Sequence, residues 1–299
     1  MIRRLRIYFK EMYPVIPRLL LGFIVFFEIY FIVLLNSGVT EFSVGLQEIA
    51  GSFTIFAFLM FLRIADDFKD YESDKVLFPD RALPSGRVLK KDLIIAVSAV
   101  TAAAAAANII LLNNLVFFIA LYGYGALMSV WFFSKKTISK SLPLALVTHN
   151  PVQIIVNLYV ISFTCIKYGL SIISWVTVLA ACTLYFPALI WEISRKIRAP
   201  KDETEYTTYS KLFGYRKPAK FVMILITADI ITNYFLVYSL SSIAVFLLSI
   251  NLVWILGSIV SFIKNPSQFV LVRKIEIYTY IQESIMLLTI FFCLLKGRI

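Results

Sequence analysis

Long and nearly uninterrupted apolar segments dominate this chain, and they restrict its fold more than any other feature. Of its 299 residues, 60% are hydrophobic and 16% are charged, whereas soluble domains carry about 25% charged residues. A spanning helix needs about 20 mostly apolar residues, and only helices or closed barrels satisfy the backbone in lipid. The apolar runs lack the alternation of barrel strands. The sequence therefore predicts an all-α polytopic membrane protein.

Nine candidate spans can be drawn between the charged segments. They are residues 13–36, 43–65, 89–112, 115–134, 141–165, 170–192, 218–239, 241–263 and 276–296. The boundary between the seventh and eighth rests on a serine cluster, with no charge to mark it. The third and fourth meet closely at Asn113 and Asn114. A count of eight or ten spans is compatible with the same pattern.

Basic residues gather on one side of this arrangement. With the N-terminus in the cytoplasm, 26 of the 29 Lys and Arg residues fall on the cytoplasmic side, as expected of membrane proteins. The opposite side keeps Lys167, Lys296 and Arg298. The charge sorting supports nine spans, with the N-terminus and the long charged loops in the cytoplasm.

The net charge of +11 is explained by this bias together with attraction to anionic lipid. We therefore expect a lipid bilayer, and not nucleic acid, as the partner of the basic surface; the sequence does not identify protein partners. The basic N-terminus leads into an apolar stretch without a small-residue cleavage site, which favours a retained first span. These features indicate a prokaryotic inner membrane.

Two of the cytoplasmic loops are long and densely charged. They are residues 63–92, after the second span, and residues 193–217, after the sixth. Their separation by three spans suggests two structural halves, as in internally repeated membrane folds. We expect residues 1–299 to form a single membrane domain in which both loops lie over a central cavity.

An acidic run begins the first of these loops. Asp66, Asp70 and Asp74 are spaced so that one helix would present them on one face, with Asp67 just off it. Like charges stacked in this way repel unless a cation lies among them. Mg²⁺ is usually held by one or two carboxylates and by substrate phosphates. The run therefore predicts a site for a metal-bound phosphate at the membrane surface.

A second polar group lies within the fifth span, where His149 and Asn150 precede Pro151. Proline frees a backbone carbonyl one turn earlier and bends a helix. Two interpretations stay open. The polar side chains either satisfy the kink, or they form a patch that contacts a substrate head group.

The segment from Asp66 to Lys75, followed by Asp80-Arg81-Ala82-Leu83-Pro84-Ser85-Gly86-Arg87, resembles the UbiA superfamily of intramembrane prenyltransferases. That family carries N-D-x-x-D-x-x-x-D after its second span and then R-x-[LI]-[PA]-S-G-[RK]. Here Asp66 replaces the usual asparagine. Nine spans with a cytoplasmic N-terminus agree as well, so the resemblance covers the whole chain and implies nine helices around a central cavity.

The resemblance also implies a set of site residues. Asp67, Asp70 and Asp74 would be catalytic and would ligate Mg²⁺ that bridges a prenyl diphosphate, with Asp66 bound to the metal directly or through a neighbouring ligand. Arg81, Arg87, Lys135 and Lys136 would help to hold the phosphates. Further substrate-binding candidates are Arg63, Lys75, His149 and Asn150.

The second family motif, an acidic D-x-x-x-D after the sixth span, is altered in this chain. Glu192 stands for the first acid, but Lys196 occupies the position four residues later. The second metal would then be absent or held by Glu192 alone, and cationic contact with the diphosphate would replace part of its role. The substrate-binding candidates here are Arg195, Arg198, Tyr209 and Lys211, with Glu192 and Lys196 as catalytic candidates.

The resemblance implies an Mg²⁺-dependent transferase that moves an isoprenyl group from a prenyl diphosphate to a lipophilic acceptor, with an aromatic acceptor favoured. Two alternatives remain. A terpene cyclase of the same superfamily would need no acceptor, and a non-catalytic lipid-binding or transport relative would explain the basic second motif.

Overall fold

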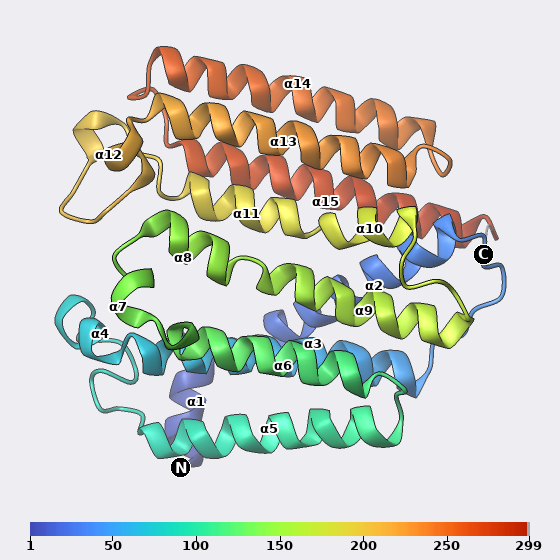
Figure 1. Cartoon of the computed structure of the whole chain (residues 1–299), viewed down its shortest axis with the longest axis horizontal. Coiled ribbons are helices and arrows are strands. Elements are labelled where there is room, and N and C mark those ends of the chain that lie inside the picture. The colour runs from blue at the N-terminus through green and yellow to red at the C-terminus, as the bar shows by residue number, and fades with distance from the viewer. Residues whose placement is uncertain (298–299) are drawn as a thin grey trace. The chain divides into compact units, whose positions relative to one another are not determined.

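The computed structural model describes residues 1–297, in which helices are joined by turns and no strand occurs (Figure 1). Arg298 lies outside the described residues. Eight helices in this part of the chain are long and apolar enough to span a membrane. They are α2 (Val15–Asn36), α3 (Leu46–Lys69), α5 (Lys90–Ile110), α8 with α9 (Leu142–Tyr168), α10 with α11 (Trp175–Ser194), α13 (Arg216–Val237), α14 (Ser242–Lys264) and α15 (Leu271–Leu295).

Each of these helices overlaps one of the expected spans, so this integral membrane protein has the helical architecture that its sequence predicts. The remaining expected span, residues 115–134, corresponds to α6 (Leu115–Ser129), a shorter apolar helix of 15 residues. The count of nine spans therefore stays a prediction, and the helical class is confirmed.

Two of the spanning helices are broken near prolines. One break separates α8 (Leu142–His149) from α9 (Val152–Tyr168) at Pro151, as expected. The other separates α10 (Trp175–Cys182) from α11 (Tyr185–Ser194). The sequence predicts one uninterrupted span, residues 170–192, here. Pro187 explains the break, because its ring crowds the carbonyl four residues earlier, at Thr183.

The acidic run does not form one continuous helix, so the single helix expected to carry Asp66, Asp70 and Asp74 is interrupted. Helix α3 ends at Lys69, Asp70 adopts φ −99° and ψ 7°, and a short helix, α4 (Tyr71–Leu77), follows. A continuous helix would stack the like charges at close range. The turn at Asp70 interrupts the helix, although the Asp70 amide still donates to the Asp66 carbonyl and the Asp74 amide still donates to the Asp70 carbonyl.

The chain forms two compact units. The first contains residues 1–29, 43–135 and 158–170, and the second contains residues 30–42, 136–157 and the chain from Ser171 onward. The loop at 63–92 belongs to the first unit, and the loop at 193–217 belongs to the second. The single membrane domain of residues 1–299 and the cavity beneath both loops stay predictions.

In the first unit, α3 packs against α5 and α6 (Figure 1). Its cytoplasmic half, by the expected orientation, joins an apolar cluster with Tyr8 and Tyr13 from the N-terminal segment, where α1 (Ile2–Glu11) lies. Helix α2 approaches α3 closely at Gly22, where an added Cβ would lie 3.0 Å from the Ser52 carbonyl oxygen. This packing fixes the end of α3 that carries the acids.

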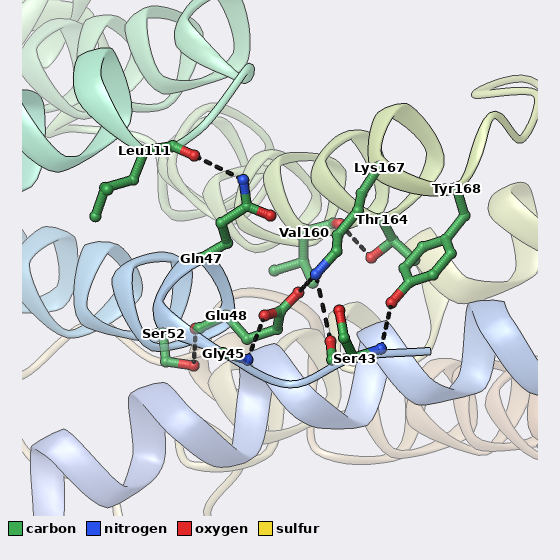
Figure 2. Close-up of polar contacts among 10 residues, drawn as sticks. All are labelled: Ser43, Gly45, Gln47, Glu48, Ser52, Leu111, Val160, Thr164, Lys167 and Tyr168. Atoms are coloured by element: carbon green, nitrogen blue, oxygen red, sulfur yellow. Dashed lines mark hydrogen bonds and ion pairs between the residues drawn. The ribbon is translucent and has the colours of Figure 1, made fainter. Parts of the chain in front are cut away.

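The other end of α3 carries a buried ion pair (Figure 2). Glu48 is fully buried, and its carboxylate pairs with Lys167 from α9 while accepting a hydrogen bond of 2.8 Å from the Gly45 amide. Lys167 also donates to the Ser43 carbonyl, and the Tyr168 hydroxyl accepts from the Ser43 amide at 3.1 Å. A buried carboxylate needs such a partner, so this end of α3 has its charge neutralised internally.

In the second unit, α13, α14 and α15 run alongside one another, and α11 packs on α13 and α15 (Figure 1). Asp229 is fully buried among them and accepts hydrogen bonds from Tyr278, Gln282 and Asn233. The Asp229 carboxyl group is thus satisfied by neutral donors.

Candidate functional site

Asp67, the last buried acid of α3, has both carboxylate oxygens engaged. Arg63, one turn earlier, donates to Oδ1 at 2.6 Å, and the Tyr8 hydroxyl donates to Oδ2 at 2.6 Å. Asp67 is 5% exposed and Tyr8 is fully buried. Burial raises the pKa of Tyr8, and the adjacent Asp67 charge raises it further. Tyr8 therefore remains a neutral donor that fixes Asp67 in place.

Asp66 is paired with Lys69, which lies at the last position of α3. The Lys69 ammonium lies 2.7 Å from Asp66 Oδ1 and 4.9 Å from the centre of the Trp131 ring. The Lys69 side chain is only 9% exposed. A partly desolvated ammonium between a carboxylate and an indole face gains from both contacts.

The Trp131 ring belongs to a strained turn. Trp131, Phe132 and Phe133 have φ values of 55°, 49° and 58°. This left-handed region costs about 1–2 kcal/mol per residue for side chains with a Cβ. Strain of this kind persists where the surroundings hold it and often accompanies a functional site. The turn leads directly into Lys135, the start of α7 (Lys135–Ile138).

Asp74 is paired with Arg81, which begins the turn after α4. Arg81 Nη1 lies 2.8 Å from Asp74 Oδ2, and its guanidinium lies 3.9 Å from the centre of the Phe78 ring. The turn is closed by a hydrogen bond from the Val88 amide to the Ala82 carbonyl. The chain thus folds back so that Arg81 meets the acid seven residues before it.

Asp70 differs from these three acids, because its side chain makes no hydrogen bond or ion pair with any described residue. Desolvation raises the pKa of Asp70, and repulsion from Asp66 and Asp74 adds to the rise. Lys69 and Lys135 oppose it by favouring the charged form. The acids therefore lie close enough to act on one another, and Lys135 lies close enough to act on Asp70.

The donor chemistry of these four carboxylates suits Mg²⁺, which prefers oxygen ligands. As the side chains stand, however, no three acidic, histidine or cysteine residues in the described part of the chain are grouped to hold a metal. The carboxylates of Asp66, Asp67 and Asp74 instead hold Lys69, Arg63 and Arg81. A metal would have to displace these cations.

A cavity of about 340 Å³ lies beside this cluster in the first unit. Its walls come from α3, α5 and α6, and they are apolar except for Lys69 and Ser129; the remaining lining residues are Phe61, Ile64, Ala65, Phe68 and Val97. The cavity therefore places an apolar wall next to the Asp66–Lys69 pair.

Two of the expected substrate-binding residues have local partners in this unit. Arg87 forms two hydrogen bonds with Glu11, at 2.5 and 2.8 Å, and so ties its turn to α1. That bond lowers the pKa of Glu11. Lys75 lies 3.6 Å from Glu72 and over the Tyr71 ring. Their predicted contact with substrate stays a prediction.

Glu192 carries two cations at the end of α11 in the second unit. Arg195 Nε lies 2.6 Å from Oε2, and Lys196 Nζ lies 2.9 Å from Oε1. The Lys196 side chain is 12% exposed. The helical spacing predicts these pairs, because residues three and four apart are neighbours on a helix. Both oxygens of the single acid are therefore in ion pairs.

The loop after α11 folds back on the end of that helix. The Tyr209 amide donates to the Lys196 carbonyl at 2.9 Å, and the Arg198 amide donates to the Ser210 hydroxyl at 2.8 Å. The side chains of Arg198 and Lys211 both bond Thr204, at 2.8 and 3.1 Å. The four basic side chains of this segment are thus gathered around one short loop.

Tyr209 lies in α12 (Tyr209–Phe213), inside this folded loop. Its hydroxyl donates to the Leu142 carbonyl at 3.4 Å. Burial and the nearby Glu192 charge raise the pKa of Tyr209 to about 12. Tyr209 is therefore a neutral residue that anchors the loop to the start of α8.

The other expected residues of the second unit lie around α8. His149 Nδ1 lies 3.1 Å from the Ala145 carbonyl and 3.0 Å from the Thr148 hydroxyl. Asn150 caps α8, and Lys136 lies in α7. These contacts are local to α8 and do not decide between the two interpretations of the kink, and a role for the three residues with a substrate stays a prediction.

Sequence reasoning missed three residues of the first unit's cluster. Lys69 lies within the acidic motif, three residues after Asp66, so helical spacing could have identified it. Tyr8 is 59 residues from Asp67, and Trp131 is further still from Lys69 along the chain. No local signal identifies these two residues, because tertiary packing brings them to the motif.

The chain was compared with known protein families, sequences and solved structures. No protein-family model and no curated protein sequence matches the chain. A solved structure described as digeranylgeranylglyceryl phosphate synthase in membranes is similar over 96% of this chain and 98% of its own, with a TM-score of 0.64 and 15% sequence identity. The expected all-helical membrane fold is therefore confirmed, and the chain shares this fold with the solved synthase structure.

Proposed function

We propose that this protein is an Mg²⁺-dependent intramembrane enzyme that transfers an isoprenyl group from a prenyl diphosphate to a lipophilic acceptor. One observation carries the proposal: four carboxylates follow one another along the chain where a spanning helix ends, within a fold shared with a prenyltransferase. A run of acids at that place has little structural use without a cation to hold.

Asp70 would be the first ligand of the metal, because its carboxylate is uncommitted and exposed. Asp66, Asp67 and Asp74 would contribute after their ion pairs open. When bound, Mg²⁺ would neutralise the charge that develops on the leaving pyrophosphate. Arg63 and Arg81 are placed next to the acids, and guanidinium groups bind phosphate through paired hydrogen bonds.

The second unit's loop would bind phosphate through cations instead of a second metal. Glu192 has no oxygen outside an ion pair, and Arg195 and Lys196 bring two positive charges to one negative charge. Arg198 and Lys211 add further charge on the same loop. This excess favours an anion and opposes a second Mg²⁺.

The isoprenyl chain requires an apolar surface close to the phosphate site. The cavity beside Lys69 offers one, with Phe61 and Phe68 among its walls. Aromatic faces also stabilise the positive charge of an allylic cation. The loops that carry these groups would face the cytoplasm of a prokaryotic cell, as the charge sorting predicts.

The acceptor is the open part of the proposal. The similar solved structure is named for a glyceryl phosphate product, which adds a glycerol-type acceptor to the aromatic ones implied by the resemblance. A cyclase would need no acceptor at all.

The test is to incubate the purified protein with Mg²⁺ and geranyl, farnesyl or geranylgeranyl diphosphate, first alone and then with aromatic or glycerol phosphate acceptors. Pyrophosphate release and lipid products are followed by mass spectrometry. Turnover that requires an acceptor supports the transferase. A hydrocarbon formed without an acceptor identifies the cyclase, and an intact diphosphate under every condition overturns the proposal.

A further inference from the structure

Three cations of the first unit hold three of the four acids of the candidate metal site. We call Arg63, Lys69 and Arg81 the resident cations. Each lies within 2.8 Å of one carboxylate: Arg63 of Asp67 at 2.6 Å, Lys69 of Asp66 at 2.7 Å, and Arg81 of Asp74 at 2.8 Å. The resident cations thus neutralise three of the four negative charges of the acidic cluster.

This pairing explains why the acids are not arranged around a common point. A divalent ion needs several carboxylate oxygens in one small volume, and in the described residues no three acids are so grouped. Three of the four carboxylates are turned toward their own cations, and Asp70 lies between α3 and the short helix α4, which carries Asp74. An ion that arrived without an anion would have to expel a resident cation and leave it without a partner.

The resident cations also have an unused capacity for an anion. The Arg63 Nε group is buried and has no hydrogen-bond acceptor within the described part of the chain. Its other end already bonds Asp67. Lys69 is buried to 9% exposure, with the face of Trp131 on one side and Asp66 on the other. Buried donors without acceptors are costly, and phosphate oxygens would supply the acceptors.

We infer that the resident cations act as placeholders which exchange partners when a metal diphosphate binds. The carboxylates of Asp66, Asp67 and Asp74 release their cations to take the metal, and Arg63, Lys69 and Arg81 turn to the phosphate oxygens. The inference rests on the proposed function, since it assumes that the acids hold a metal diphosphate. It adds that the metal alone binds weakly, and that metal and diphosphate promote each other's binding.

The exchange has a physical advantage that a plain acidic site lacks. Four acids without cations would repel one another across the turn, whereas the paired cluster is stable before substrate arrives. After binding, every charge again has a partner: carboxylate with metal, metal with phosphate, and phosphate with cation. By the reciprocity of coupled binding, the metal raises diphosphate affinity by the factor by which the diphosphate raises metal affinity.

The test measures Mn²⁺ binding to the purified full-length protein by electron paramagnetic resonance, without diphosphate, in the wild type and in Lys69→Gln. Removing one competing ion pair should tighten Mn²⁺ binding by about fivefold. In Mg²⁺, the same substitution should weaken binding of unreactive farnesyl thiodiphosphate, measured by calorimetry, by a similar factor. The two effects have opposite signs, whereas a merely structural lesion would weaken both.

Arg81→Gln repeats the test at a second resident cation, should Lys69→Gln fail to fold. Lys69→Arg keeps the charge, so its Mn²⁺ affinity should lie closer to that of the wild type than the affinity of Lys69→Gln does. Lys90→Gln is the matched control, because this substitution removes the same charge from the same unit. Lys90 lies over the Tyr71 ring, 3.7 Å from its centre. Equal or weaker Mn²⁺ binding in both Lys69→Gln and Arg81→Gln overturns the inference.

The failure of the proposed function would look different. Wild-type protein that binds no farnesyl thiodiphosphate at saturating Mg²⁺ would contradict the prenyl diphosphate substrate. The comparison of Mn²⁺ affinities between the wild type and Lys69→Gln would still be readable in that case, because it uses the metal alone.

Discussion

The two charged regions at helix ends both contain ion pairs, but acids outnumber their paired bases in the first and bases outnumber the acid in the second. At the end of α3, three of four acids each hold one cation. At the end of α11, the single acid Glu192 holds two. The first region is therefore an acidic cluster compensated by bases, and the second is a basic cluster anchored by one acid. The difference suggests that the first region recognises a metal and the second recognises phosphate directly.

The two regions also differ in how firmly they are held. Asp67 is fixed by the fully buried Tyr8 and lies against the apolar cluster of α1 and α3. Glu192 is held by residues of its own helix, and the following loop closes over α11 through backbone bonds at Lys196 and Arg198. The first region is thus rigid through tertiary packing, whereas the second is ordered mainly by local contacts.

The largest effect should come from removing acids of the first region. Asp70→Asn and Asp74→Asn should each lower the rate of pyrophosphate release by about 100- to 1,000-fold, since the metal would lose a ligand. Asp80→Asn is the control, because it removes an acid from the same loop outside the ion-paired cluster. Near-wild-type release in both variants would mean that the first region does not hold the metal.

The next largest effect should come from adding a second acid to the second region, which makes it resemble the acidic first region. Lys196→Asp replaces the buried ammonium with a carboxylate one turn from Glu192. A second metal can then bind, so the dependence of turnover on Mg²⁺ should become steeper, with a Hill coefficient rising toward about 2. Lys201→Asp, in the exposed part of the loop, should leave it unchanged. If the Mg²⁺ dependence of turnover in Lys196→Asp is the same as in the wild type, Lys196 is not what prevents a second metal from binding.

A smaller effect should follow from loosening the first region's tertiary anchor. Tyr8→Phe removes the hydrogen bond to the buried Asp67 carboxylate, which should cost about 1–3 kcal/mol of stability. Thermal unfolding in detergent checks this loss. Tyr13→Phe, which loses a bond of 2.9 Å to the neutral Phe56 carbonyl, should cost less. If Tyr13→Phe proves the more damaging of the two, the anchoring role of Tyr8 is wrong.

The smallest effect concerns the exposed pair of Arg87 and Glu11. The bond to Arg87 holds the pKa of Glu11 below its usual value. A carboxyl whose pKa is lowered in the folded state stabilises the fold above its unfolded pKa, and it loses that contribution as pH falls through the folded pKa. Glu11→Gln should therefore be slightly less stable than the wild type near pH 7. The two melting temperatures should converge in acid; a gap that persists there would exclude this ion pair as its source.

The sequence predicts the helical architecture because apolar length alone decides it. It also predicts the break at Pro151, since that break depends on local helix geometry. It fails at the turn of Asp70, where α3 ends and α4 begins although no proline or glycine marks the interruption. It also fails at Tyr8 and Trp131, because only the packing of distant segments brings them to the motif.

The difference between the two regions is tested most directly by locating manganese in crystals grown with Mn²⁺ and farnesyl thiodiphosphate. Anomalous scattering identifies the metal without reference to activity. We expect manganese bound by Asp70 and Asp74 together with phosphate oxygens, with Arg81 turned to the phosphate, and no manganese beside Glu192. Manganese ligated by Glu192, or none among the acids at the end of α3, would contradict the division into a metal-binding and a phosphate-binding region.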